Sequence, residues 1–336
     1  MAAAAAPAAA GGALTVSLNT DKLNFDGSLS FAPLEALVGE VRLHDGTAGR
    51  RQTLERVPQG ARILVTKEME VDAETIAALP ASVELIAEAG TGYNNIAIAA
   101  ARARGITVCN IPVYSTEAMA HTVMTFVLSL SCSMNQVQRK LWTDAVDVPG
   151  WHNMRGLPHF ELMGKTIGLI GGRGTIGSKV TQLCQAFGMR VIITSRSTHR
   201  TTTGAEVVGM DELLAQSDFV SVHCPLNDET RGSIGMGHFR KMKPTAFLIN
   251  TARGAILNQE ELCDALEQDL FAGAGIDVQE VEPPPAESRL WRLARKNVLL
   301  TPHIGWQRKE TRQRLIDDTV KNIECFLAGR PSNVVN

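Results

Sequence analysis

The stretch GLIGGRGTIGSKV, residues 168–180, runs from an apolar segment through a glycine-rich turn into the helical pattern IGSKVTQLCQAFG. Gly172, Gly174 and Gly177 have the spacing G-x-G-x-x-G. In such a loop the first glycine permits a tight turn. The second lets a pyrophosphate approach the backbone, and the third lets the helix pack closely on the strand. Because a strand precedes the motif and a helix follows it, the stretch predicts a dinucleotide site with phosphates at the helix N-terminus.

The segment MRVIITSRSTHR, residues 189–200, contains the next expected strand and the turn after it. A site for NAD places Asp or Glu there, on the ribose hydroxyls, but this strand ends at Ser195 and Arg196. Serine does not repel a 2′-phosphate, and arginine can bind one through charge-assisted hydrogen bonds that contribute about 1.5–3 kcal/mol. The two residues favour NADP(H), with NAD possible. The alternative is a solvated basic turn in a protein indifferent between the cofactors.

The whole chain alternates short β-branched runs with helical stretches, in two successive regions. Alternation of this kind predicts parallel sheets with helices on both faces. We therefore expect an α/β protein with two doubly wound, Rossmann-like domains. The expected strands cover residues 14–19, 41–45, 61–66, 83–89 and 106–110, and then 166–171, 190–195, 218–224, 246–251, 271–277 and 297–302.

Two long helices are also expected. One follows Ser115 or Thr116, either of which can cap it, and leads into a loop-rich region that carries Trp142. The other closes the chain over residues 307–328. Residues 1–13 are rich in alanine and lack the charge pattern of a signal or transit peptide, so we expect a disordered tail.

Composition excludes several classes of protein. A formal net charge of −2 over 336 residues gives no sign of binding to nucleic acid or to an anionic membrane. The longest uncharged apolar run, residues 123–134, is too short to span a bilayer. The six cysteines are scattered without the spacing of a metal site or a disulfide framework. We therefore expect no metal, reduced and buried thiols, and a cytoplasmic location.

Three segments after the glycine loop carry candidate catalytic residues. Arg253, Asp277 and His303 each follow or end an expected strand, and Glu282 lies just beyond the same strand as Asp277. The carboxyl ends of parallel strands form the edge of an open α/β sheet where ligands bind. The four side chains are therefore expected at one edge.

These residue types suit the reduction of a 2-keto acid by hydride. The reaction needs a cation near the carbonyl and carboxylate groups, and an acid that protonates the new alkoxide. Arg253 suits the first task and His303 the second. Glu282 could accept a hydrogen bond from His303, orient its ring and favour the imidazolium form.

With these residues in place, the chain resembles the D-isomer-specific 2-hydroxyacid dehydrogenases over roughly residues 14–330. The motifs of the resemblance share the family's order and spacing. They are AGTGYNNIAIAAARARGITVCNIP, YSTEAMAH, the glycine loop, HCPLNDETRG, LINTARGAI, GIDVQEVEPPP and TPHIGW.

The resemblance implies roles for individual residues. It implies catalytic roles for Arg253, Glu282 and His303, and it implies that Asp277 lies beside the nicotinamide. The backbone N–H groups of Thr91 and Gly92 would bind the substrate carboxylate. Further residues implied to line the cofactor site are Thr175, Ile176, Cys224, Pro225, Thr230, Thr251 and Ala252.

The resemblance also implies a split architecture. The substrate domain would comprise residues 14–111 and 308–336, with a nucleotide-binding domain of residues 112–307 inserted into it. The long helix that begins near residue 115 would then be a hinge and part of a homodimer face.

The chain departs from the family pattern at three points. Its loop IGGRGTIG is one residue longer than the usual IGLGRIG, His121 replaces a frequent Glu or Gln, and Ser195 replaces the cofactor acid. Trp306, the stretch VDAETIAALP and the Trp-bearing region 142–160 resemble the glycerate dehydrogenase and hydroxypyruvate/glyoxylate reductase branch.

We therefore expect NADPH-dependent reduction of glyoxylate to glycolate, or of hydroxypyruvate to D-glycerate. The small 2-keto or 2-hydroxy acid would be its partner, together with a second copy of the chain. Two alternatives stay open: a reductase for a larger 2-keto acid, and a corepressor-like protein that senses its cofactor on the same fold.

Overall fold

The computed structural model describes residues 13–47, 49–143, 156–195, 203–293 and 297–336. Within these ranges the chain forms two compact units, one of residues 13–114 and 307–336 and the other Ser115–Trp306. Of the expected tail, only Ala13 is described, and it is buried. Residues 1–12 lie outside the described residues.

The first unit contains a five-stranded sheet in which every pair of neighbours is parallel. Its strand order, β2-β1-β3-β4-β5, is that of a flavodoxin-like doubly wound sheet, with the winding reversed between β1 and β3. The strands are β1 (Thr15–Leu18), β2 (Val41–His44), β3 (Ile63–Thr66), β4 (Leu85–Glu88) and β5 (Thr107–Cys109).

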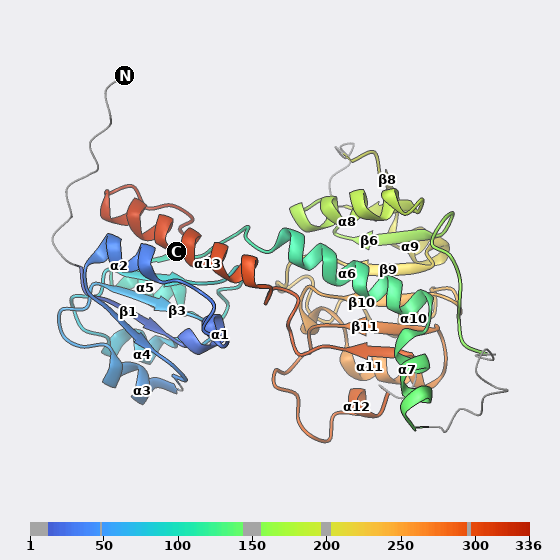
Figure 1. Ribbon diagram of the computed structural model, residues 1–336, viewed down its shortest axis with the longest axis horizontal. Helices are drawn as coiled ribbons and strands as arrows, with labels where there is room; N and C mark the ends of the chain where they lie inside the picture. The colour runs from blue at the N-terminus through green and yellow to red at the C-terminus, as the bar shows by residue number, and fades with distance from the viewer. Residues whose placement is uncertain (1–12, 48, 144–155, 196–202, 294–296) are drawn as a thin grey trace. The chain divides into compact units, whose positions relative to one another are not determined.

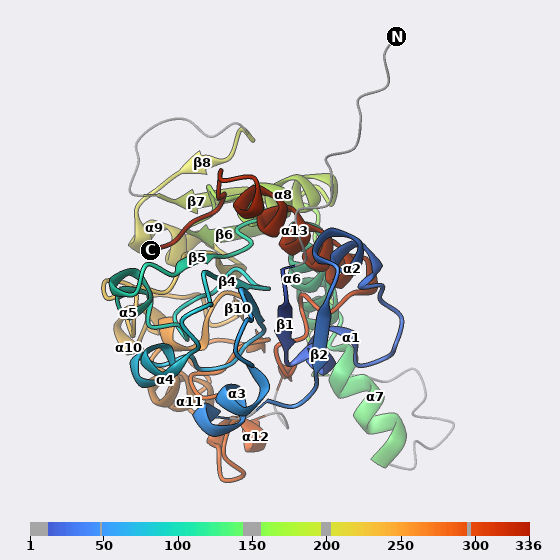
Figure 2. The same ribbon diagram turned by 90° about the vertical axis from the view of Figure 1, so that its left-hand side faces the viewer.

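Helices lie on opposite sides of this sheet, with α2 and α13 on one side and α3 and α4 on the other (Figures 1 and 2). The chain end thus returns to the first unit as α13. The helices are α1 (Thr20–Asn24), α2 (Ala32–Val38), α3 (Gly49–Arg56), α4 (Ala73–Ala78), α5 (Ile98–Ala103) and α13 (Lys309–Leu327).

The second unit contains a seven-stranded parallel sheet in the order β12-β11-β10-β9-β6-β7-β8. Read from β6, this is the Rossmann order with one strand added at the far edge. The strands are β6 (Thr166–Ile170), β7 (Arg190–Thr194), β8 (Glu206–Val207), β9 (Phe219–Val222), β10 (Phe247–Asn250), β11 (Gly273–Ile276) and β12 (Val298–Leu300).

Side chains along the central strands alternate between two cores, as the two-residue period of a strand requires. Leu248 packs with the cluster under α9 and α11, whereas Phe247 and Ile249 pack with the cluster under α6 and α8. Helices therefore cover both faces, which confirms the doubly wound prediction. The helical elements are α6 (Thr116–Ser131), α7 (Met134–Thr143), α8 (Thr175–Ala186), α9 (Met210–Gln216), α10 (Met236–Phe239), η2 (Gly254–Ile256), α11 (Gln259–Glu267) and α12 (Arg289–Leu293).

The sequence prediction was wrong at three local points. Trp142 belongs to helix α7 and not to a loop, and the second sheet gains the strand β8, whose two residues are too few to show a period. Ser115 occupies the position before α6, but its side chain makes no capping hydrogen bond. No helix in the described ranges is long and apolar enough to cross a membrane.

Candidate active site

The ends of β10, β11 and β12 bring together Arg253, the segment from Asp277 to Glu282, and His303. These strands are neighbours in one parallel sheet, so their carboxyl ends share an edge. Arg253 opens the short helix η2 after β10, Asp277 follows β11 directly, and His303 lies three residues after β12. The expectation that strand ends would gather these residues at one edge is confirmed.

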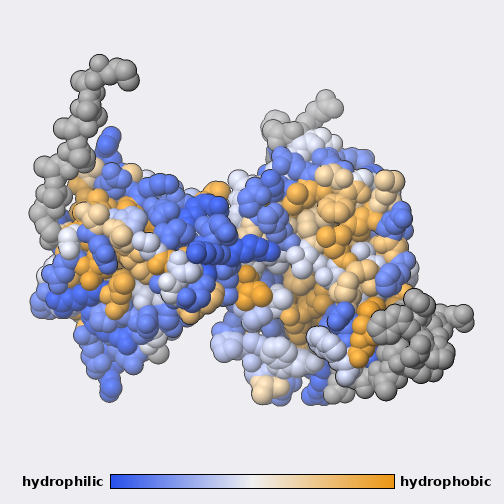
Figure 3. Space-filling model, in the orientation of Figure 1, coloured by the Kyte–Doolittle hydropathy of each residue, from blue (hydrophilic) through white to orange (hydrophobic). Residues whose placement is uncertain are grey.

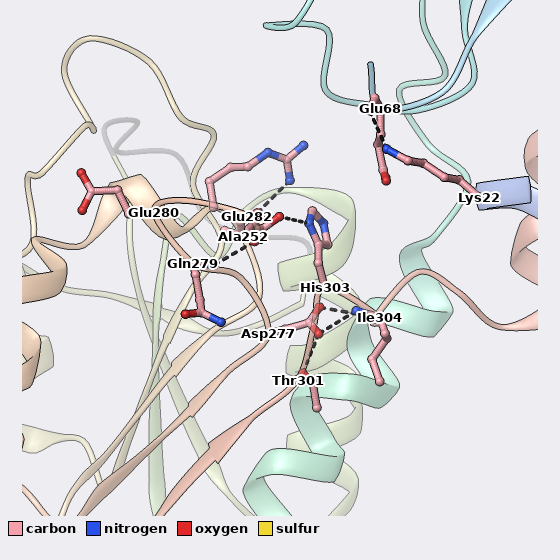
Figure 4. Close-up of polar contacts among 12 residues, drawn as sticks. Lys22, Glu68, Ala252, Asp277, Gln279, Glu280, Glu282, Thr301, His303 and Ile304 are labelled. Carbon is pink, nitrogen blue, oxygen red and sulfur yellow. Dashed lines mark hydrogen bonds and ion pairs between the residues drawn. The ribbon is translucent and has the colours of Figure 1, made fainter. Parts of the chain in front are cut away.

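His303 and Glu282 are joined by a hydrogen bond (Figure 4). Nδ1 of His303 lies 2.7 Å from Oε2 of Glu282, and Oε1 of Glu282 accepts the backbone N–H of Gln279 at 2.8 Å. Burial raises the pKa of Glu282, but His303, the Gln279 N–H and the charge of Arg253 outweigh burial and hold it below its ordinary value. An ionised carboxylate only accepts hydrogen bonds, so Nδ1 carries a proton and the ring is fixed with Nε2 left for a substrate.

Asp277 holds the turn that carries His303. Its side chain is 1% exposed, and its carboxylate accepts hydrogen bonds from Thr301 Oγ1 at 2.6 Å, Ile304 N at 2.9 Å and Gly305 N at 3.0 Å. The backbone N–H of His303 donates to the carbonyl of Asp277 at 2.8 Å. His303 has φ +55°, a left-handed conformation that costs energy in a residue with a side chain. The Asp277 contacts therefore maintain a strained backbone at the proposed acid.

The Arg253 segment is packed directly against the segment that bears Glu282. A Cβ atom on Gly254 would lie 1.9 Å from the carbonyl carbon of Gln279, so only glycine permits this approach. Arg253 itself is half-buried, and its Nη1 donates to the carbonyl of Ala252 at 2.8 Å. Gly254 was not among the residues predicted from sequence. Its place immediately after a candidate catalytic arginine was the available signal.

The glycine loop between β6 and α8 fits a pyrophosphate, with one correction to the roles of its residues. Gly174 is the N-cap of α8, and a Cβ there would meet no protein atom, which leaves the helix N-terminus open to a phosphate. A Cβ on Gly177 would lie 2.3 Å from the carbonyl oxygen of Gly172, as close packing of helix on strand requires.

The tight turn was assigned to the wrong glycine. Gly171, not Gly172, has the left-handed φ of +77°, and its Cα faces the backbone of Cys224, which a Cβ would approach to 2.8 Å. Gly172 instead allows packing against Leu169 and Ile193. The loop is one residue longer than the usual motif. Gly171 therefore makes the turn and Gly172 permits the close packing, where the usual motif has one glycine.

Other residues implied for the cofactor site lie on the same edge. Cys224 and Pro225 follow β9, and Thr230 ties their turn by donating from Oγ1 to the Pro225 carbonyl at 2.7 Å. Thr251 is buried after β10, and Ala252 N donates to Asn250 Oδ1 at 3.0 Å. Thr175 opens α8, while the Ile176 side chain packs against the core.

The residues expected to select the cofactor are only partly described. Ser195 directly follows β7 and is partly exposed, but Arg196 lies outside the described residues. His223, at the end of β9, contacts Ser221 Oγ through Nε2 at 2.9 Å, and burial lowers its pKa to about 4. His223 is therefore uncharged at neutral pH.

In the first unit, Thr91 and Gly92 form a loop after β4. Thr91 Oγ1 donates to the carbonyl of Ile111 at 2.8 Å, and Asn110 Nδ2 donates to the carbonyl of Thr91 at 2.8 Å. Among the described residues, none accepts a hydrogen bond from the backbone N–H of Thr91 or Gly92. The loop is thus held firmly while both donors stay available for an anion.

Comparison with known proteins agrees with this geometry. The family profile described as "D-isomer specific 2-hydroxyacid dehydrogenase, NAD binding domain" matches residues 124–305. A hydroxypyruvate reductase of Blautia hydrogenotrophica is 35% identical over 318 residues, which are 92% of this chain and 96% of that protein. A glycerate dehydrogenase of Methylorubrum extorquens is 34% identical over 300 residues, 88% of this chain and 92% of that protein.

Solved structures give the same answer. The crystal structure of a glyoxylate reductase from Paecilomyes thermophila superposes with a TM-score of 0.81 at 30% identity, covering 96% of this chain and 98% of that one. The chain therefore belongs to the D-isomer-specific 2-hydroxyacid dehydrogenase family, and it is an oxidoreductase that uses a nicotinamide cofactor on a 2-hydroxy or 2-keto acid.

Proposed function

We propose that this protein is an NADPH-dependent reductase of small 2-keto acids, converting glyoxylate to glycolate or hydroxypyruvate to D-glycerate. The observation that carries the proposal is the 2.7 Å contact between His303 and Glu282, with the charge of Arg253 acting on the same carboxylate. The printed names of the relatives support the substrates, since they include hydroxypyruvate reductase, glycerate dehydrogenase and glyoxylate reductase.

The placement of these side chains supports the proposed chemistry. When bound, the reduced nicotinamide supplies a hydride to the keto carbon. His303 donates a proton from Nε2 to the carbonyl oxygen as that oxygen gains charge, and Glu282 stabilises the imidazolium before the transfer. The guanidinium of Arg253 attracts the carbonyl and carboxylate oxygens of the substrate. In the other unit, the backbone N–H groups of Thr91 and Gly92 are the candidate donors to a carboxylate.

We assign the unit Ser115–Trp306 to the cofactor and the other unit to the substrate. The NAD-binding family profile, the glycine loop and the open N-terminus of α8 support the first assignment. The N-terminus of α8 at Gly174 would hold the pyrophosphate, and Gly171 and Gly177 would shape the loop around it.

We infer a preference for NADP over NAD from the residues after β7. Ser195 stands where an NAD site would place an acid, and Arg196 follows it in sequence. A carboxylate at this position would repel a 2′-phosphate, whereas serine can donate a hydrogen bond to one.

The first experiment compares kcat/KM for NADPH and NADH with glyoxylate and with hydroxypyruvate. We expect a preference for NADPH of about tenfold or more, and we expect Ser195→Asp to reduce or reverse it. Equal use of the cofactors by the wild-type protein would refute the cofactor assignment. NADPH-dependent capture of a partner without turnover of any keto acid would favour the cofactor-sensing alternative.

We also propose that the enzyme is a cytoplasmic homodimer. All six cysteines lie in the described residues and none forms a disulfide, which suits a reducing compartment. Three of them are buried as we expected, and three are partly exposed. Apolar surface gathers near α6 and α8 in Figure 3, and Leu128 of α6 and Trp142 of α7 are 41% and 82% exposed. A contiguous apolar patch on a protein surface is typical of an interaction site. Light scattering after size-exclusion chromatography tests the dimer, which a monomeric mass at micromolar concentration would contradict.

A further inference from the structure

Two charged side chains are buried at the carboxyl ends of neighbouring strands in the first unit. Lys67 follows β3 and is 2% exposed, and Glu88 ends β4 and is 1% exposed. Thr66 Oγ1 donates to Glu88 Oε2 at 2.6 Å, the Glu68 backbone N–H donates to Oε1 at 3.2 Å, and Lys67 Nζ lies 2.6 Å from Glu68 Oε1. Burying several charges is costly, and the reaction derived above uses none of them.

Both buried charges lie beneath the loop that carries Thr91 and Gly92. A Cβ on Gly90 would lie 3.2 Å from Oε1 of Glu88 and 3.8 Å from Nζ of Lys67. The carbonyl of Gly90 in turn accepts the backbone N–H of Ile111 at 2.9 Å. The charged groups therefore lie next to Gly90, the residue that directly precedes Thr91 and Gly92 in the chain. The backbone N–H groups of Thr91 and Gly92 are the donors that have no described acceptor.

The neighbouring backbone is strained as well. Asn19 and Glu68, after β1 and β3, have φ values of +58° and +48°. Asn19 Nδ2 donates to the carbonyl of Lys67 at 3.1 Å, and Lys22 Nζ donates to the carbonyl of Glu68 at 2.8 Å (Figure 4). Strained non-glycine residues persist where surrounding contacts fix them, often at functional edges. The winding of this sheet reverses between these two strands, which is where doubly wound sheets bind ligands.

We propose that Lys67 is a positioning residue for the substrate carboxylate. Its ammonium group offsets the carboxylates of Glu88 and Glu68 beneath the loop, so that an anion can approach the N–H groups of Thr91 and Gly92. This inference rests on the proposed function, because it assigns the carboxylate of the keto acid to that loop.

The balance of charges beneath the loop predicts whether each substitution weakens or strengthens the binding of an anion. Glu88 braces the loop through its hydrogen bonds to Thr66 and Glu68. Burial raises its pKa to about 6, with the charge of Lys67 lowering it, so the carboxylate is ionised at neutral pH. Without the ammonium, two carboxylates would remain beside the anion-binding N–H groups. Without the Glu88 charge, the ammonium would be less offset, and the loop would attract an anion more strongly.

The test measures KM and kcat for glyoxylate and hydroxypyruvate at saturating NADPH in the full-length protein. We expect Lys67→Met to raise KM about tenfold or more, with kcat within about twofold, since a uniform binding interaction is lost. We expect Glu88→Gln to leave KM unchanged or lower it, and the double variant to recover most of the Lys67→Met loss. Lys321→Met removes an exposed lysine of α13 in the same unit and is the charge-matched control, with KM unchanged.

Two outcomes would overturn the proposal. One is a Lys67→Met protein with the wild-type KM. The other is a double variant no better than Lys67→Met, because a purely structural role predicts additive damage. If Lys67→Met does not fold, Lys67→Arg, which keeps the charge, should retain the KM, and the double variant carries the test. Calorimetry with oxamate, an unreactive analogue of a 2-keto acid, should rank the variants in the same order. It therefore separates failure of this inference from failure of the proposed reaction.

Discussion

The two sheets of this protein each place a glutamate next to a cation at the carboxyl ends of their strands, yet the two carboxylates behave in opposite ways. Glu282 is paired with His303 and held below its ordinary pKa, whereas burial raises the pKa of Glu88 to about 6 beside Lys67. Aimed donors and charges outweigh burial at Glu282, but not at Glu88. In our proposals, a similar pair of residues thus serves a proton transfer in one unit and a binding loop in the other.

Replacing the proposed acid should give the largest effect. We expect His303→Gln to lower kcat/KM for hydroxypyruvate by about 10²–10⁴-fold, because general acid catalysis contributes about that much. NADPH binding, followed by the fluorescence of the cofactor, is the control and should not change, since the glycine loop is untouched. Activity within tenfold of the wild type would remove His303 from the chemistry.

The partner of the acid should matter through pH. We expect Glu282→Gln to lower kcat/KM by about tenfold or more. We also expect the loss of reduction activity at alkaline pH to begin at a lower pH, because a neutral amide no longer favours the imidazolium form. The measurement is the pH–rate profile of both proteins from about pH 5 to 9. A parallel drop at all pH values would show that Glu282 only orients the ring.

The close approach of the Arg253 and Glu282 segments depends on one backbone contact, between Gly254 and Gln279. We expect Gly254→Ala to destabilise the protein by about 1–3 kcal/mol, because its methyl group would overlap the Gln279 carbonyl. Activity should fall too, since the segments of Arg253 and Glu282 would separate. Gly237→Ala in α10 is the matched control: no atom lies within 4 Å of its Cβ, and alanine favours the helix. Equal melting temperatures for the two variants would contradict the packing argument.

The residues at the sheet edge of the second unit could be predicted from sequence, whereas the buried charges at the edge of the first unit could not. Arg253, Glu282 and His303 each come shortly after an apolar strand, so parallel-sheet geometry alone predicted that they meet, and the hydrogen bond between the last two is confirmed. Lys67 and Glu88 also end strands, but exposed lysines and glutamates are the norm. Their burial depends on packing by segments distant in the chain, which no local pattern records.

Backbone detail was equally hidden. Four glycines in seven residues fit the loop motif, but which of them takes the left-handed turn depends on contact with the backbone of Cys224 after β9. Helix α7 was missed because its one large aromatic residue, Trp142, projects to solvent. Sequence patterns therefore predicted which residues share an edge of the sheet, whereas the strained backbone and the buried charges are visible only in the folded structure.

The smallest expected effect distinguishes the two glutamates by stability alone. The pKa of Glu88 is about 6 against an ordinary 4.5, so the folded state binds more protons and loses stability as the pH rises through this window. Glu88→Gln removes that loss. As the pH rises from 4.5 to 7, the free energy of unfolding of Glu88→Gln should increase by about 1–2 kcal/mol relative to that of the wild type, at 1.36 kcal/mol for each pKa unit.

For Glu282 the sign is reversed. Its lowered pKa means that ionisation stabilises the folded state above the ordinary value and that this stabilisation is lost as the pH falls. The free energy of unfolding of Glu282→Gln should therefore decrease relative to that of the wild type as the pH rises from about 3.5 to 5. Thermal unfolding of both variants over about pH 3.5–7 provides the comparison. For each variant, the difference in stability from the wild type is plotted against pH. Slopes of the same sign for the two variants would mean that the two carboxylates share one environment, and the contrast between the two edges would fail. Opposite slopes would show that burial dominates at Glu88 and the partner side chains at Glu282.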